Sequence, residues 1–231
     1  MMIPSKSLRK NLLKNIMANN KKIIIFDMDG VIINSIDLML ELNQNRFPDS
    51  TRKDLELLFT GNIHEQIDNL KETYNTANSS QQEQENLRNA YTERKTLTVE
   101  MYPGIKELIV LLVENGYRLS INTSASDANT FRLLERLKIK DFFDYIITRD
   151  FTQSKVDKFR ELSRLYESEV TDFVFITDSL GDVLEANELH IPTLAVTWGV
   201  HGSEYFQGKD VIAILDSVDE LKKYLITNST A

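Results

Sequence analysis

The chain has 231 residues, of which 42% are hydrophobic and none is cysteine, and its formal net charge is −8. The length exceeds one average domain of ~100 to 200 residues, so we expect one domain with an insertion, or two small domains. The missing cysteines exclude a disulfide framework, a thiolate metal site and cysteine catalysis, and no apolar run approaches the ~20 residues that a membrane helix needs.

Basic residues are concentrated at the start of the chain. Residues 1–22 hold six basic side chains and no acid, so the rest of the chain carries −14. An acidic body argues against a nucleic-acid partner, but not against a small phosphorylated substrate. Within residues 1–20, Leu8, Leu12 and Ile16 recur at helical spacing. They predict a short amphipathic helix in an N-terminal extension, solvated or docked on the protein, with a membrane-surface, targeting or partner-docking helix as the alternative.

No secretory signal is visible in this extension, because Lys14 interrupts the apolar stretch and no small-residue cleavage site follows. We therefore expect a cytoplasmic protein without membrane insertion. We expect it to be a monomer or a homodimer.

The first predicted strand ends at two acids. Ile23, Ile24, Ile25 and Phe26 read as a buried strand, and Asp27 and Asp29 follow where the strand gives way to a loop at Gly30. Two carboxylates at the end of a buried strand repel each other unless a cation lies between them. The stretch therefore predicts a divalent metal site, with a surface turn carrying two solvated acids as the alternative.

The next 66 residues, 35–100, favour helices. Ser35 is placed to cap a helix through about Asn43, and apolar residues then recur mostly at helical intervals, without the period-two alternation of strands. The segment Asn75–Asn86, rich in Asn, Ser and Gln, is predicted to be an exposed connection between helices. We interpret residues 35–100 as an inserted helical cap domain.

From Met101 onward, predicted strands alternate with predicted helices. This order indicates an α/β fold with a doubly wound parallel sheet, a Rossmann-like core formed by residues 21–34 and 101–231. The strands are expected at Arg118–Asn122, Tyr145–Thr148, Phe173–Thr177, Thr193–Val196 and Val211–Ile214. The helices are expected at residues 103–115, Asp127–Lys138, Val156–Ser168, Leu180–Leu189 and Val218–Ile226.

Polar side chains follow these strands at one edge of the predicted sheet. Thr123 and Ser124 follow one strand with hydroxyls and main-chain N–H groups, which suit an anion. Lys155 begins a helix with a compact positive charge, and Asp178 and Asp182 follow a third strand. Ligands of doubly wound sheets bind at the carboxyl ends of the strands, so we expect these groups to converge with Asp27 and Asp29.

The same residues resemble the four motifs of the haloacid dehalogenase-like (HAD) phosphohydrolases. The stretch Asp27-Met28-Asp29-Gly30-Val31-Ile32 with Ser35 is similar to the first motif, and Thr123-Ser124, Lys155 and Asp178-Ser179-x-x-Asp182 are similar to the other three. The resemblance covers residues 21–226 and is to the phosphoglycolate phosphatase and β-phosphoglucomutase branch. Asn34 stands where an Asp is usual, and Thr177 where a Gly is usual.

The resemblance implies a Mg²⁺-dependent phosphatase that acts on a small phosphorylated metabolite of the phosphoglycolate, sugar phosphate or nucleotide type. Asp27 would be the nucleophile that forms an aspartyl-phosphate, and Asp29 the general acid and base. Mg²⁺ would be held by the Asp27 carboxylate, the Asp29 main-chain carbonyl and Asp178, with Asp182 supporting the site indirectly or through water. Phosphate would be bound by Thr123, Ser124 and Lys155.

Two alternatives stay open at this point, a β-phosphoglucomutase-like phosphomutase and a non-catalytic binding protein with the HAD fold. Met39 stands where mutases of the branch place a histidine, which counts against a mutase, and the retained Asp29 and Lys155 count against a silent protein. His64 stands where mutases have an arginine and phosphonoacetaldehyde hydrolases a lysine. We treat His64 as a candidate specificity residue.

Overall fold

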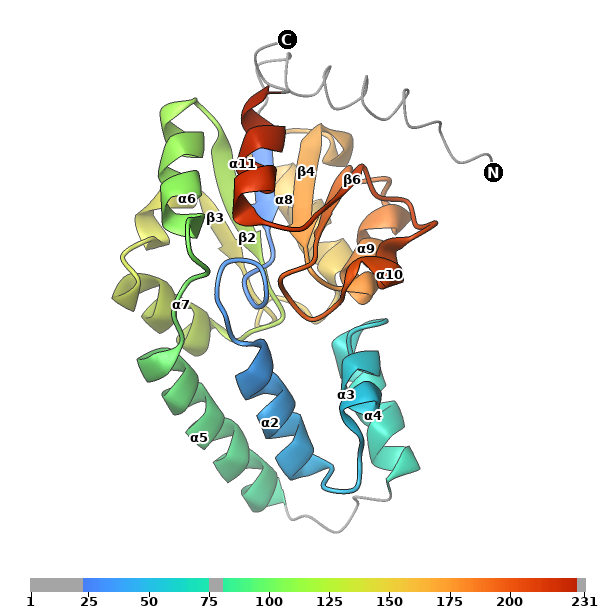
Figure 1. Cartoon of the computed structure of the whole chain (residues 1–231). Coiled ribbons are helices and arrows are strands. Elements are labelled where there is room, and N and C mark those ends of the chain that lie inside the picture. Colours follow the sequence, from blue (N-terminus) through green and yellow to red (C-terminus); the bar gives the residue numbers. More distant parts are fainter. Residues whose placement is uncertain (1–22, 75–80, 228–231) are drawn as a thin grey trace.

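The computed structural model describes residues 23–74 and 81–227 and contains one six-stranded, wholly parallel sheet (Figure 1). The strand order is β3-β2-β1-β4-β5-β6. The strands are β1 (Ile23–Phe26), β2 (Arg118–Asn122), β3 (Tyr145–Ile147), β4 (Phe173–Thr177), β5 (Thr193–Val196) and β6 (Ala213–Leu215). The predicted doubly wound parallel sheet is therefore confirmed.

Helices cover both faces of the sheet, which is why β1 is apolar on both of its sides. Ile24 and Phe26 pack in the larger core under α6, α7 and α11, whereas Ile23 and Ile25 pack with residues of α8 and α9 on the opposite face. The helices are α6 (Ile105–Glu114), α7 (Asp127–Arg136), α8 (Lys155–Tyr166), α9 (Leu180–Glu188), α10 (Ser203–Phe206) and α11 (Val218–Thr227), with 3₁₀ turns at Lys140–Phe142 and Val170–Asp172.

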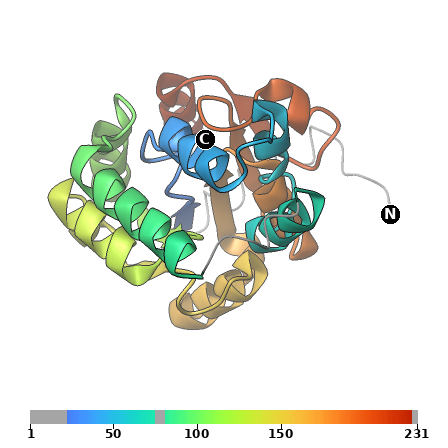
Figure 2. The same ribbon diagram turned by 90° about the horizontal axis from the view of Figure 1, so that it is seen from below.

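Of the helices between β1 and β2 in the described residues, the four that precede α6 lie beyond the carboxyl ends of the strands (Figures 1 and 2). Their own small core explains why they stay together: the apolar residues Ile36, Leu40, Phe47, Leu55, Leu58 and Phe59 are all buried there. The helices are α2 (Ile36–Arg46), α3 (Arg52–Leu57), α4 (Ile63–Thr73) and α5 (Gln81–Thr98). We call this group the helical insertion.

The two chain segments that connect the helical insertion to the sheet run side by side. Ile33 and Met101 form an isolated antiparallel bridge, and the Asn34 N–H donates to the Glu100 carbonyl at 2.9 Å. The chain thus enters and leaves the helical insertion at one place.

Three local predictions differ from the structure or lie outside it. Residues 81–86 of the predicted Asn75–Asn86 connection are helical, because α5 begins at Gln81; Gln and Glu are good helix formers, and an exposed helix needs no apolar periodicity. The last strand is Ala213–Leu215 rather than Val211–Ile214, since the N–H of Val211 bonds the carbonyl of Lys209 in a turn. The rest of the connection and the N-terminal extension lie outside the described residues.

Candidate active site

The loop after β1 approaches the loop after β4 so closely that only glycine fits. Gly30 has a φ of 75°, in the left-handed region, and a Cβ there would overlap the Oδ2 atom of Asp178. A Cβ at Gly199 would overlap the same oxygen. The Asp178 carboxylate is therefore enclosed between two glycines, and Oδ2 also accepts a hydrogen bond from the Val200 N–H at 2.7 Å.

Lys155, the first residue of α8, joins two of the predicted acids. Its Nζ lies 3.0 Å from Oδ1 of Asp27 and 2.6 Å from Oδ2 of Asp182, and the side chain is 2% exposed. Nζ also donates to the Asn122 carbonyl at the end of β2. Burial disfavours its charge, but the carboxylates of Asp182 and Asp27 outweigh burial and raise the pKa of Lys155, so the side chain stays cationic.

The buried acids carry more negative charge than Lys155 neutralises. Burial raises the pKa of Asp27 to about 7, with Lys155 opposing the shift and Asp182 adding to it. Burial, followed by repulsion from Asp27, also raises the pKa of Asp178 well above its ordinary value. Two buried carboxylates that resist ionisation are a site that a divalent cation would stabilise.

Asp29 is held by two residues, one just before the first helix of the helical insertion and one on its last helix. Its Oδ1 accepts a hydrogen bond from the Ser35 hydroxyl and forms an ion pair with Nζ of Lys95, which is buried on α5. Ser35 is the N-cap residue of α2, but its side chain makes no capping hydrogen bond, so that prediction was wrong. The hydroxyl is used on Asp29 instead.

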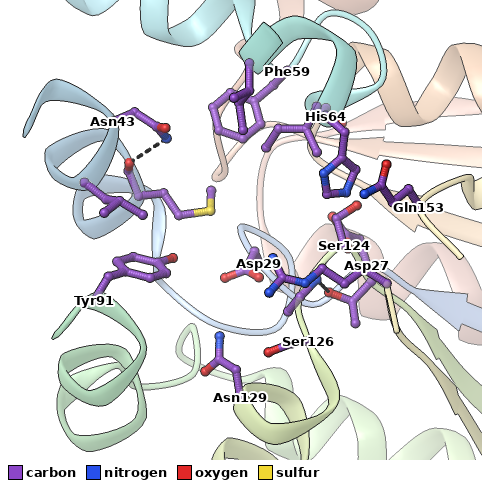
Figure 3. Close-up of a pocket in the computed structure, with 18 of the residues that line it drawn as sticks. Asp27, Asp29, Asn43, Phe59, His64, Tyr91, Ser124, Ser126, Asn129 and Gln153 are labelled. Carbon is purple, nitrogen blue, oxygen red and sulfur yellow. Dashed lines mark hydrogen bonds between the residues drawn. The ribbon is translucent and has the colours of Figure 1, made fainter. Parts of the chain in front are cut away.

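The loop after β2 also has a lysine beneath it. Thr123 is buried, and its hydroxyl accepts a hydrogen bond from the Ala125 N–H at 3.1 Å. Its carbonyl accepts a hydrogen bond from Nζ of Lys158 at 2.8 Å. Burial and the charge of Lys155 lower the pKa of Lys158 to about 8. Ser124 follows and lines the pocket described below (Figure 3).

Asp182 shares the amino group of Lys155 with Asp27. Its Oδ2 accepts hydrogen bonds from Lys155 and from the Thr177 hydroxyl, at 2.6 and 2.7 Å. Thr177, which replaces the usual Gly, therefore contributes a donor that orients Asp182. The hydroxyl of Thr177 also accepts a hydrogen bond from the Ser179 N–H at 3.2 Å.

A pocket of about 360 Å³ lies between the sheet edge and the helical insertion. Figure 3 shows Asp27, Asp29 and Ser124 on the sheet side, with His64 and Phe59 across from them. All eight residues predicted from the sequence to form the site line this pocket, namely Asp27, Asp29, His64, Thr123, Ser124, Lys155, Asp178 and Asp182. The sequence thus placed the site, although it missed Lys95 and Lys158.

His64 faces the pocket from the start of α4. Its Nε2 atom is buried and has no hydrogen-bond partner. Burial, followed by the charges of Arg149 and Lys158, lowers the pKa of His64, so the imidazole is neutral at pH 7.

The helical insertion is closed onto the sheet edge by main-chain contacts. The Gly181 N–H donates to the Phe59 carbonyl at 2.8 Å, and a Cβ at Gly181 would overlap the Gly61 carbonyl. Nδ1 of the buried His201 accepts a hydrogen bond from the Leu180 N–H at 2.9 Å. Because that nitrogen is an acceptor, Nε2 carries the proton, and it lies 3.2 Å from the Glu56 carbonyl on the helical insertion.

Known proteins share this architecture. The family model described as haloacid dehalogenase-like hydrolase matches residues 24–196. Pyrophosphatase PpaX of Bacillus cereus (strain Q1) is 22% identical over 207 residues, which are 86% of this chain and 93% of that protein. A structure described as a predicted phosphoglycolate phosphatase from Haemophilus somnus has a TM-score of 0.68 at 19% identity, over 90% of this chain and 98% of that chain. CbbY from Rhodobacter sphaeroides, solved in complex with phosphate, has a TM-score of 0.67 at 23% identity, over 87% and 96%.

The family match runs from β1 to β5 and covers well over half of the 231 residues. It includes each predicted strand-end residue, from Asp27 to Asp182, and the helical insertion between β1 and β2. The chain therefore belongs to the haloacid dehalogenase-like hydrolases, the enzyme family that its four motifs resemble.

Proposed function

We propose that the protein is a Mg²⁺-dependent phosphatase that hydrolyses a small phosphate monoester through a covalent aspartyl-phosphate. The observation that carries this proposal is the arrangement of Asp27, Asp29 and Lys155 at one end of a single pocket. A buried carboxylate beside a fixed cation suits a nucleophile, and a second, less buried carboxylate suits a proton carrier.

Asp27 has one oxygen held in place and one available for attack. Oδ1 accepts a hydrogen bond from the Met28 N–H at 2.8 Å and contacts Lys155. Oδ2 makes no hydrogen bond within residues 23–74 and 81–227. In the proposed first step, Oδ2 attacks phosphorus in line, the bond between phosphorus and the ester oxygen breaks, and Asp29 gives its proton to the departing alkoxide.

Asp29 then works in the opposite direction. As a carboxylate it accepts a proton from water while the water oxygen attacks phosphorus, and the bond between phosphorus and Asp27 breaks to release inorganic phosphate. The Ser35 hydroxyl and Lys95 both contact Oδ1 of Asp29, which leaves Oδ2 directed to the pocket for both proton transfers. Asp29 is 16% exposed at its side chain, so water can reach it.

The residues present fit Mg²⁺. Within the described ranges, no group of three acidic, histidine or cysteine side chains could hold a metal ion by itself. The proposed ligand set therefore combines two side-chain carboxylates, Asp27 and Asp178, with one main-chain carbonyl, that of Asp29. That set is all oxygen and leaves positions for water and phosphate, as Mg²⁺ prefers. When bound, Mg²⁺ would neutralise charge on the transferring phosphoryl group and lower the pKa of the buried acids.

Phosphate oxygens would be bound by the groups around Asp27. We assign this role to Lys155 and to the hydroxyl and main-chain donors of Thr123 and Ser124, because stabilisation of the phosphoryl oxygens supplies most of the catalysis in phosphoryl transfer. Asp182 would keep Lys155 in position. Lys158, through the Thr123 carbonyl, would fix the loop that carries the donors.

We also propose that residues 35–100 act as a cap domain and residues 21–34 and 101–231 as the core. The paired connections at Asn34 and Glu100 support this division, because the helical insertion is attached to the sheet at one place. His64 belongs to the cap and keeps its proposed role in specificity, supported by its place in the pocket lining.

The proposal is tested by measuring phosphate release from 2-phosphoglycolate, sugar phosphates, nucleotides and pyrophosphate, with Mg²⁺ or EDTA. We expect release that needs Mg²⁺ and that Asp27→Asn abolishes while the circular dichroism spectrum stays unchanged. An Asp27→Asn protein that kept a tenth of the wild-type rate would remove Asp27 as the nucleophile. Release from no substrate, despite Mg²⁺ binding, would favour a phosphomutase or a catalytically silent protein.

A further inference from the structure

Three arginines line the same pocket as the proposed catalytic acids. Arg46 is the last residue of α2, Arg88 lies on α5, and Arg149 follows β3; all three line the pocket. Arg88 precedes Lys95 by seven residues, or about 10 Å along the helix, and both face the pocket. Since Lys95 contacts Asp29, Arg88 marks a position about two helical turns from the proposed reaction centre.

Arg88 repels both of the other arginines. Burial, followed by the charge of Arg88, lowers the pKa of Arg46, and the same two causes lower the pKa of Arg149. The members come from three separate elements, so only the closed fold brings them together. We call Arg46, Arg88 and Arg149 the arginine rim.

The acids of the described part of the chain neutralise the arginine rim only in part. Arg46 and Arg88 form no ion pair there, and Arg149 forms one at 3.8 Å with Asp150. Asp68 lines the pocket and attracts Arg46 but forms its own ion pair with Lys71 at 2.6 Å. Two arginines without an ion pair to a described residue and a third with a long one, all in one pocket, form a site for an anion supplied from outside.

Asn43 and His64 belong to the same pocket wall as the arginine rim (Figure 3). Oδ1 of Asn43 and Nε2 of His64 are buried atoms without a hydrogen-bond partner among the described residues. Because they are buried, these two atoms do not present hydrogen-bonding groups to the open pocket, and the arginine rim supplies the charge that an anion would meet there.

We propose that the arginine rim binds a second anionic group of the substrate, so that the substrate is a phosphate monoester with a phosphate or carboxylate at its far end. This inference rests on the proposed phosphatase function and names its substrate class. One end binds at Asp27 and Lys155, and the arginine rim binds the other end.

The spacing separates this substrate class from compounds with adjacent anionic groups. The two cationic positions on α5, Lys95 and Arg88, are about 10 Å apart along the helix, which suits a sugar-sized framework. The two phosphates of pyrophosphate are joined through one oxygen and cannot reach both positions. Pyrophosphate is therefore expected to be a poor substrate.

The test compares matched substrates in the presence of Mg²⁺. Glucose 6-phosphate and 6-phosphogluconate differ in a far-end carboxylate, and fructose 6-phosphate and fructose 1,6-bisphosphate differ in a far-end phosphate. We expect kcat/KM to be at least tenfold higher for one doubly anionic member than for its partner. The pair that shows the larger ratio identifies the far-end group as carboxylate or phosphate.

Variants then show whether the arginine rim causes this preference. Arg88→Gln keeps helix propensity and hydrogen-bonding capacity but removes the charge, and we expect it to reduce the preference ratio to threefold or less. Arg94→Gln is the matched control, because Arg94 lies on the same helix but pairs with Glu41 and does not line the pocket. The Arg94→Gln protein should keep the wild-type ratio.

Each outcome decides between the two proposals. Equal kcat/KM within both pairs, or a ratio unchanged in Arg88→Gln, overturns the arginine rim as an anion site and leaves the phosphatase intact. Loss of phosphate release from every compound overturns the phosphatase instead. In that case equilibrium binding of fructose 1,6-bisphosphate decides the inference: binding at least tenfold weaker in Arg88→Gln than in Arg94→Gln supports the arginine rim, and equal binding overturns it.

Discussion

The two ends of the pocket differ in how their charged side chains are paired. At the sheet edge, which we call the pocket floor, Lys155 contacts Asp27 and Asp182 at 3.0 and 2.6 Å, and all three are buried. At the arginine rim, Arg46 and Arg88 have no ion pair within the described residues. At the pocket floor Lys155 already pairs with acids of the chain, although a negative excess remains, whereas at the arginine rim two of the three cations have no ion pair within the described residues. Under the proposed function, the pocket floor carries the reaction and the arginine rim selects the substrate.

The largest expected effect breaks the pairing of the pocket floor. Lys155→Met leaves the buried carboxylates of Asp27 and Asp182 without their cation, which lowers the free energy of unfolding by about 3 to 5 kcal/mol at pH 7.5 without Mg²⁺. Chemical denaturation measures this change. Lys140→Met is the matched control, because Lys140 forms an exposed ion pair with Glu135, and its loss should cost less than about 1 kcal/mol. Equal losses in the two variants would contradict the comparison.

The second effect concerns the charge that Lys155 leaves unneutralised. Asp27, with a pKa of about 7, and Asp178, whose pKa is also raised, must both lose a proton before they bind Mg²⁺, so the affinity for Mg²⁺ should rise by at least about tenfold per pH unit below pH 7. Titration calorimetry between pH 5.5 and 8.5 measures the profile. Asp27→Asn should make the profile less steep, and a wild-type affinity independent of pH would place the metal elsewhere.

The third effect concerns Lys95, which lies on the same helix as Arg88 and contacts Asp29 at the sheet edge. Lys95→Met removes the ion pair to Asp29, and we expect kcat to fall by about tenfold because Asp29 loses one of the two contacts that orient it. KM should change less than kcat. Lys95→Arg should recover part of the rate, and stopped-flow or steady-state phosphate release measures all three proteins. A change in KM with kcat unchanged would contradict the proposal that Lys95 positions Asp29.

The smallest effect has the opposite sign. Without ligand, Arg88→Gln relieves the repulsion among Arg46, Arg88 and Arg149, so the free energy of unfolding should rise by up to about 0.5 kcal/mol at low salt. Arg94→Gln, which loses the ion pair to Glu41, should leave it unchanged or lower it. Chemical denaturation at low and high salt measures both. A destabilised Arg88→Gln protein would show that the arginine rim is not repulsive.

The sequence was most informative where one local pattern decides the structure. The strands Arg118–Asn122, Phe173–Thr177 and Thr193–Val196 were predicted with their observed bounds, because apolar runs end there at turn residues. Seven of the eight predicted residues lie together in the pocket because parallel strands bring their carboxyl ends to one edge, whereas His64 was predicted only from the family resemblance.

The residues that were missed depend on packing between distant segments. Lys95 lies in a polar stretch 66 positions after Asp29, and nothing in its spacing indicates that it is buried against that acid. The arginine rim joins three elements that meet only when the helical insertion closes. Lys158 had one available signal, its position one helical turn after Lys155.

The side-by-side connections at Ile33 and Met101 have a consequence for how the fold tolerates change. A segment whose ends are already adjacent adds no loop-closure cost to the sheet when its interior is shortened, lengthened or replaced. Substitutions and length changes between α2 and α5 can therefore occur while no strand has to shift. Under the proposed function, new substrates can be accepted by changes in the interior of the helical insertion, provided that Ser35 and Lys95, which contact Asp29, are kept.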